Sequence, residues 1–177
     1  MSADNNRRLE NLIRLGRIAS VTPSTPFHTV TVNLGDIVTD ELRLLNLRSG
    51  KDKTNDLPSI GEECVVISPC GDLAQAIVIG YLNNNDNPTP SQDPNIKLRI
   101  FEDGAVISYD TKNHSLQALL PEGAEAIITA NCRINGSLHV TEGITTDGDV
   151  KAGDISLKHH KTSKVKAGSD DSGEPIP

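Results

Sequence analysis

The feature that most constrains this chain is a strict alternation of side chains over residues 126–141. Apart from Ile127, the odd positions are polar, whereas the even positions are apolar or small: Ala126, Ile128, Ala130, Cys132, Ile134, Gly136, Leu138 and Val140. A period of two is typical of a β-strand with one covered face. This face has no aromatic side chain, so burying it removes little apolar area from water. The stabilisation is therefore small, because each Å² of buried apolar area contributes about 25 cal/mol. We therefore expect copies of the same chain to cover it.

The alternation weakens toward the end of the chain, where Gly143, Gly148 and Gly153 mark expected corners. Its phase then changes, because Ile155 and Leu157 occupy odd positions. This pattern predicts an intertwined trimeric β-prism or β-helix spike that ends in a point and leaves no sheet edge exposed. Six side chains are expected in the axial core: Ile128, Ile134, Leu138, Val140, Ile155 and Leu157. A monomeric β-solenoid is the competing architecture, although solenoids usually repeat coils of fixed length.

The first half of the chain predicts a compact domain of a different kind. Residues 8–15 have the apolar spacing of a short amphipathic helix. Five short strands are expected after it, separated by turn residues, at 17–21, 29–34, 41–46, 63–67 and 74–79. Such a series is typical of a small Greek-key barrel of the oligonucleotide/oligosaccharide-binding (OB) type. Because aromatic residues are only 2% of the sequence, its core must come from Ile, Leu and Val.

A polar segment with several prolines, residues 83–95, follows the predicted barrel and is expected to be a linker. Beyond it, residues 97–101 and 105–109 predict a hairpin, and residues 115–120 predict a third strand. The chain is therefore expected to be all-β. We expect an N-terminal strap at residues 1–16, an OB domain at 17–82, the linker at 83–95, a spike shaft at 96–154 and an apex at 155–177.

Composition narrows the classes of function. The formal net charge of -7 offers no basic face for nucleic acid. Cys64, Cys70 and Cys132 are an odd number without a C-x-x-C pair, so we expect reduced cysteines that serve in packing. No apolar run reaches the ~18 residues of a membrane span, and residues 1–16 lack the apolar segment of a signal peptide, which predicts synthesis in a cytoplasm. Common catalytic motifs are absent, so we expect no catalytic residue.

Seven segments spread along the chain carry a resemblance to a known family, with 103–109 the most specific: residues 12–16, 38–40, 60–62, 68–73, 83–91, 103–109 and 172–175. In these segments the chain resembles the baseplate assembly protein V family, the central membrane-piercing spikes of contractile-tailed phages and related tailocins. Family members often carry Trp around the positions of residues 41–45 and after the position of Thr54, where this chain has Leu and Asn.

This resemblance implies a non-enzymatic homotrimer in the tail baseplate of a virion, assembled in the host cytoplasm. Its OB domain would dock onto the tail hub protein, and its tip would puncture the host outer membrane when the sheath contracts. A tailocin or a type VI-like secretion machine is an alternative setting. Two functions of another class stay open, namely a β-solenoid carbohydrate-active enzyme and an OB-fold nucleic-acid binder.

The resemblance also implies a metal at the apex, because the family ends in a His-x-His pair and three copies supply six imidazoles to one iron. Aligning the tails places residues 160–162 on this pair, so the first histidine is kept and the second is a threonine. His160 is the expected ligand of one iron or zinc ion per trimer, with His159 and Thr162 as weaker candidates. Simple alternation along the preceding residues would instead point His159 toward the axis.

Overall fold

The computed structural model describes residues 3–159, 161 and 168. The chain divides into two compact units, Met1–Glu125 and Ala126–Pro177, which are considered separately below. The expected linker at residues 83–95 thus lies inside the first unit. The described residues are mostly strands and irregular backbone with one short α-helix, which confirms the mainly β class. Within the same residues, no helix has the length and apolar character that a membrane crossing requires.

Helix α1 (Ala3–Asn11) opens the described chain. The carboxylate of Asp4 accepts hydrogen bonds from Arg7 at 2.8 Å and Arg8 at 3.1 Å, an arrangement that supports one helical turn. The predicted helix over residues 8–15 is wrong at its end, because strand β1 (Ile13–Thr22) already starts at Ile13. Residues 13–17 pair with β4, and this ladder overrides the local helical spacing.

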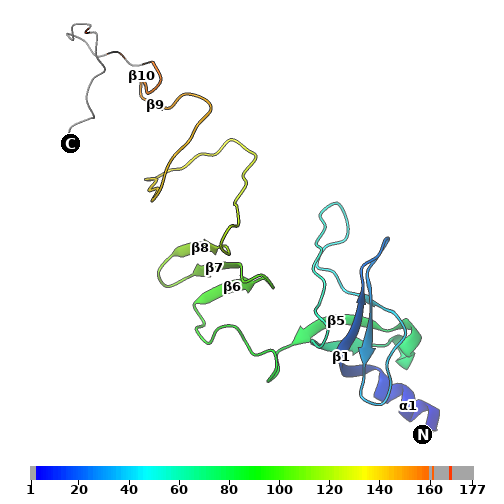
Figure 1. Cartoon of the computed structure of the whole chain (residues 1–177). Helices are drawn as coiled ribbons and strands as arrows, with labels where there is room; N and C mark the ends of the chain where they lie inside the picture. The colour runs from blue at the N-terminus through cyan, green and yellow to red at the C-terminus, as the bar shows by residue number, and fades with distance from the viewer. Residues whose placement is uncertain (1–2, 160, 162–167, 169–177) are drawn as a thin grey trace. The chain divides into compact units, whose positions relative to one another are not determined.

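Five strands form a closed barrel in the order β1-β2-β3-β5-β4 (Figure 1). The pairing of β3 with β5 is parallel and the other four pairings are antiparallel. The remaining strands of the barrel are β2 (Thr29–Asn33), β3 (Leu42–Leu44), β4 (Glu63–Ile67) and β5 (Ile77–Leu82).

The last barrel strand lies later than predicted. Residues 74–79 were the expected strand, but β5 begins only at Ile77. Two short 3-10 turns precede it, η1 (Pro69–Gly71) and η2 (Leu73–Gln75). The carboxylate of Asp72 accepts a hydrogen bond from the backbone N–H of Ala74 at 3.1 Å, so this segment is held as a turn and cannot join the ladder.

The barrel encloses a small aliphatic core, as the scarcity of aromatic residues predicts. Its buried members are Ile18, Val30, Val32, Leu34, Leu42, Cys64, Val66, Ala76 and Val78. A Cβ atom at Gly16 would lie 2.5 Å from Val32 Cγ1, so only glycine lets β1 pass this close to β2. Cys64 is buried as expected, whereas Cys70 and Cys132 are exposed in the single chain.

A three-stranded antiparallel sheet follows the barrel, with strand order β6-β7-β8 (Figure 1). Its strands are β6 (Ile96–Ile100), β7 (Val106–Asp110) and β8 (Ser115–Leu119). The predicted hairpin and third strand are therefore confirmed to within one or two residues. Gly104 adopts a φ of +88° in the first turn, a conformation that favours glycine.

The second unit contains little regular structure within one chain. Residues 126–150, all of them described, belong to no helix or strand. Strands β9 (Lys151–Ala152) and β10 (Ile155–Ser156) then form a two-residue antiparallel ladder. The alternation at 126–141 is therefore not matched by a ladder in the part of the chain that the structure describes.

Candidate functional site

The six predicted axial side chains are all exposed in the single chain, by 40% to 75% of their surface. They are Ile128, Ile134, Leu138, Val140, Ile155 and Leu157. The structure does not gather them into a core within one copy. Exposed apolar side chains in such number point to an interaction site in a protein whose other domain is well packed.

The backbone of the same segment leads to a similar conclusion. Residues 126–150 lie outside every helix and strand that the structure describes, so their N–H and C=O groups join no ladder with the described residues. Extended segments commonly satisfy such groups by pairing with another strand. A partner strand would therefore satisfy the backbone and cover the apolar face at once.

The outer surface of the barrel carries a second apolar surface, a row of three isoleucines across adjacent strands. Ile13 of β1 is paired with Ile67 of β4, and Ile67 is paired with Ile77 of β5. Each of the three is at least 36% exposed. A cross-strand row of β-branched residues usually packs against another element. We call Ile13, Ile67 and Ile77 the barrel row.

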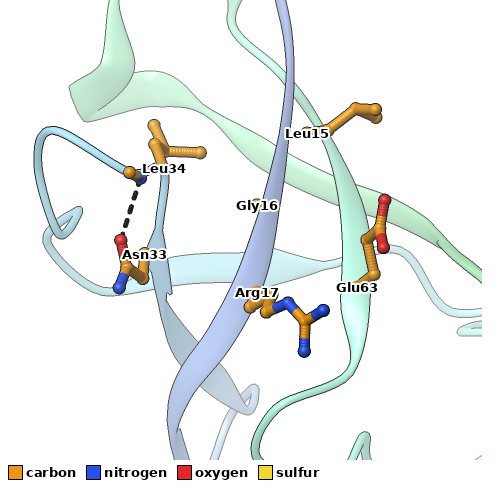
Figure 2. Close-up of a pocket in the computed structure, with 7 residues that line it drawn as sticks. Leu15, Gly16, Arg17, Asn33, Leu34 and Glu63 are labelled. Atoms are coloured by element: carbon orange, nitrogen blue, oxygen red, sulfur yellow. Dashed lines mark hydrogen bonds between the residues drawn. The ribbon is translucent and has the colours of Figure 1, made fainter. Parts of the chain in front are cut away.

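A shallow depression of about 390 Å³ lies where β1 meets the end of β2 (Figure 2). Figure 2 shows Arg17 and Glu63 on neighbouring strands, and Asn33 Oδ1 accepting a hydrogen bond from the N–H of Gly35 at 2.9 Å. The guanidinium of Arg17 is engaged by Asp86 at 2.8 Å. The lining has one carboxylate and no imidazole or thiol, so it offers no acid and base pair for hydrolysis.

The perturbed titratable groups of the barrel point to packing and not to catalysis. Burial raises the pKa of the Cys64 thiol to about 11, so it is not a thiolate nucleophile at neutral pH. Burial, with a smaller effect of Glu62, raises the pKa of Tyr81 to about 12. The hydrogen bond from Arg14 lowers the pKa of the Asp36 carboxyl, and this pair is 2.7 Å apart at the barrel surface.

His28 lies in the loop between β1 and β2 and contacts residues of two loops of the barrel. Its Nε2 atom lies 2.8 Å from Asn55 Oδ1, and its Nδ1 atom accepts a hydrogen bond from the N–H of Ser24 at 3.1 Å. His28 thereby ties two loops of the barrel together. No local sequence signal pairs residues 27 positions apart, so only the barrel topology reveals this role. His114 and His139 are exposed.

The tip residues are only partly covered by the structure. His159 is exposed, and its backbone N–H donates a hydrogen bond to Ser156 Oγ at 2.8 Å. His160 and Thr162 lie outside the described residues. The described part of one chain holds no group of three metal-ligating side chains. Imidazole ligands suit iron or zinc. Several histidines are needed to hold one such ion, so a metal at the tip would need histidines from several copies.

Two comparisons with known proteins bear on this site. Residues 14–82 match a family model described as the type VI secretion system/phage-baseplate injector OB domain, which confirms the OB domain predicted at 17–82. The chain is also similar to the spike protein of Escherichia phage P2, with 32% identity over 135 residues. That alignment covers 76% of this chain and 60% of the phage P2 protein. The chain thus spans less than two thirds of this relative.

Proposed function

We propose that the chain is a homotrimeric, non-enzymatic spike of a contractile tail, because residues 14–82 match the injector OB domain and the chain is similar to the spike protein of Escherichia phage P2. Its location is the tail baseplate of the virion. One observation supports the trimeric spike: a well-packed barrel is joined to an alternating segment, residues 126–141, whose apolar face and backbone have no partner strand among the described residues of the chain.

The proposed mechanism is mechanical. In a trimeric prism the alternating segments of three copies bury their even positions on a common axis and pair their backbones along the shaft. A dry core enclosed by interchain hydrogen bonds resists bending and unfolding under load. Small residues such as Ala130 and Gly136 let three backbones approach closely, so the shaft narrows and force is concentrated at its end.

The two ends of the spike are assigned to different partners. The barrel row of Ile13, Ile67 and Ile77 is exposed, which supports docking of the OB domain onto the tail hub protein. The shaft and apex are driven through the host outer membrane when the sheath contracts. The family description also names type VI secretion systems, so a secretion machine or a tailocin is the second candidate setting for the same mechanism.

Binding of single-stranded nucleic acid is disfavoured by the barrel surface. OB domains of that kind stack bases on exposed aromatic side chains in a basic groove. Phe27 and Tyr81 are the aromatic residues of this barrel, and the guanidinium of Arg43 already stacks over the ring of Phe27 at 4.7 Å from its centroid. The sequence is also acidic, with a net charge of -7.

A pair of adjacent substitutions tests the proposed axis. Leu138→Asp places three carboxylates on the axis of the trimer, where repulsion and desolvation oppose assembly. His139→Asp introduces the same charge on the polar face of the same segment. We expect light scattering to show loss of the trimer for Leu138→Asp and its retention for His139→Asp. Equal behaviour of the two variants would contradict the axial assignment.

We further propose that His160, with His159 and Thr162 as weaker ligands, holds one iron or zinc ion per trimer. Such an ion would join three chain ends and add its binding free energy to the stability of the assembly. Elemental analysis of the purified protein should give about one metal ion per three chains. His160→Ala should abolish this metal, and His139→Ala should leave it. A metal content far below one per trimer in the unaltered protein would overturn the proposal.

A further inference from the structure

The alternating segment 126–141 contains the one Asn–Gly pair of the sequence, Asn135 and Gly136. Asn135 belongs to the polar face of the segment and Gly136 to the apolar face. Asparagine is a labile residue, most of all before glycine. The glycine nitrogen can attack the side-chain amide, because no Cβ atom hinders its approach. The pair is therefore a potential site of deamidation wherever its backbone is free to bend.

The structure leaves this pair open to that reaction in a single chain. The backbone bends at Asn135 and Gly136, and both residues are exposed. Apart from the neighbouring residues in the chain, no heavy atom lies within 4 Å of the place where a Cβ atom of Gly136 would be. Among the residues that the structure describes, neither the Asn135 amide nor the Gly136 N–H has a hydrogen-bond partner. The attacking nitrogen and the amide carbon are thus adjacent and exposed to solvent.

The two Asp–Gly pairs of the same chain differ from this pair in their hydrogen bonds. The N–H of Gly104 donates a hydrogen bond to the carbonyl of Phe101 at 3.0 Å. The N–H of Gly148 donates a hydrogen bond to Thr146 Oγ1 at 3.2 Å. Each of these nitrogens must give up its hydrogen bond before it can attack the preceding side chain, and an ionised carboxylate is a weaker electrophile than an amide. The geometry therefore singles out the Asn–Gly pair.

We propose that Asn135–Gly136 is a site of spontaneous deamidation in the unassembled chain, and that assembly of the shaft closes it. The backbone nitrogen of Gly136 bonds to Cγ of Asn135 and the bond from Cγ to Nδ2 breaks, so that ammonia leaves with the proton of the Gly136 N–H. Water then opens the cyclic imide at either of its carbonyl carbons. One opening gives an aspartate at position 135. The other gives an isoaspartate, in which a side-chain carbon has become part of the main chain.

The closure follows from the three-copy assembly proposed above, on which this inference rests. In that shaft the backbone of residues 126–141 is extended and paired, so a neighbouring strand engages the N–H of Gly136. An extended backbone also directs the side chain of Asn135 to the polar face and away from the attacking nitrogen. The reaction must then wait for local opening of the strands, and the free energy of that opening sets how much the reaction is slowed.

The two products have different effects on the shaft. An aspartate at position 135 adds a charge on the solvent-facing side of the strand and keeps the alternation intact. An isoaspartate adds a carbon atom to the main chain and so breaks the phase that places Leu138 and Val140 on the same face as Ile134. Chains that isomerise before assembly therefore lose the ability to join a shaft, whereas assembled chains are protected.

Peptide mapping by mass spectrometry tests the site. The unaltered protein and Leu138→Asp are incubated at mildly alkaline pH, and unaltered protein dissociated in guanidinium chloride serves as the open reference. Asn135 should deamidate in the open reference and in Leu138→Asp, and at least about tenfold more slowly in the assembled protein, where the reaction waits for opening. Asn131 is exposed in the same segment but precedes Cys132, so it is the internal control and should stay intact. Reaction of Asn135 no faster than that of Asn131 in the open reference would overturn the site.

Two substitutions separate the added charge from the added main-chain carbon. Asn135→Asp carries the charge without the isomer, and light scattering should show that it assembles like the unaltered protein. Asn135→Gln removes the reactive pair, because the longer side chain cyclises far more slowly. After ageing in guanidinium chloride and dilution, Asn135→Gln should reassemble better than equally aged unaltered protein. The isoaspartate of the unaltered protein, measured with an isoaspartate-specific methyltransferase, should remain in the chains left out of the trimer. Equal isoaspartate in both fractions would contradict the effect on assembly.

The outcomes separate this inference from the proposed function. If light scattering shows a trimer in which Asn135 reacts as fast as in the open reference, assembly does not close the site, and this inference is wrong while the trimeric spike stands. If the unaltered protein is a monomer, the proposed function is wrong and the closure by assembly is wrong with it. A trimer that protects Asn135, together with a reactive Asn135 in Leu138→Asp, supports both.

Discussion

At the scale of single residues, Gly71 fixes helix α1 to the barrel. It has a φ of +71°, and a Cβ atom placed on it would collide with the backbone of Arg8. The helix therefore packs on η1 by direct backbone approach, which no other residue type permits. The sequence does show Gly71, but a contact between residues 8 and 71 follows only from the closed barrel.

Gly71→Ala should consequently destabilise the barrel and release α1. Gly61→Ala is the matched control, since Gly61 has a φ of +92° but open space around it. The positive φ alone costs an alanine about 1 kcal/mol, so Gly61→Ala should lower the free energy of unfolding by about that amount. Chemical denaturation should show a larger loss for Gly71→Ala because the collision is added. Equal losses would mean that α1 does not pack against Gly71.

At the scale of elements, period-two alternation predicted the sheet of β6, β7 and β8 well. The spacing of apolar residues and the glycine of the first turn are local properties, so the sequence reveals them. The start of β1 and the delay of β5 were mispredicted, because pairing with β4 and capping by Asp72 decide them. The barrel row was missed as a surface, since its members come from three strands far apart in sequence.

One contact between elements predicts a pH dependence. Arg14 of β1 donates hydrogen bonds to the carbonyl of Leu34 at 3.1 Å and to the carboxylate of Asp36 at 2.7 Å. The hydrogen bond from Arg14 to the Asp36 carboxylate holds the pKa of Asp36 below its ordinary value of 3.8. The folded state thus favours the ionised carboxylate. Its contribution to stability is present above the unfolded pKa and is lost as the pH falls through the folded pKa.

Asp36→Asn should therefore reduce the loss of stability that occurs as the pH falls below about 4. The effect should be small, because Asp36 is exposed to solvent and exposed ion pairs contribute little. The measurement is the urea midpoint of the unaltered and variant proteins between pH 2 and pH 6. An unchanged difference between the two midpoints over this range would show that the pair makes no ionisation-dependent contribution.

At the scale of the whole molecule, the chain combines a barrel that buries its own core with a segment that does not. The barrel core is closed by intrachain pairings, whereas residues 126–150 form no intrachain ladder. Sequence alternation revealed the second property, because one lean apolar face cannot be stable alone. The alternation could not assign the interchain contacts, because it indicates which face of a strand is covered but not which strand covers it. The tip ligands His160 and Thr162 lie outside the described residues, so the metal stays a prediction.

The most direct test of the central claim is the mass of the purified protein in solution, measured by size-exclusion chromatography with light scattering. Three chains of 18.9 kDa give an expected mass of about 57 kDa. A trimeric spike should keep this mass on dilution, because its shaft residues have no stable partner within one copy. A monodisperse species of 18.9 kDa would contradict the account, because the apolar face of the shaft would then be covered within a single chain.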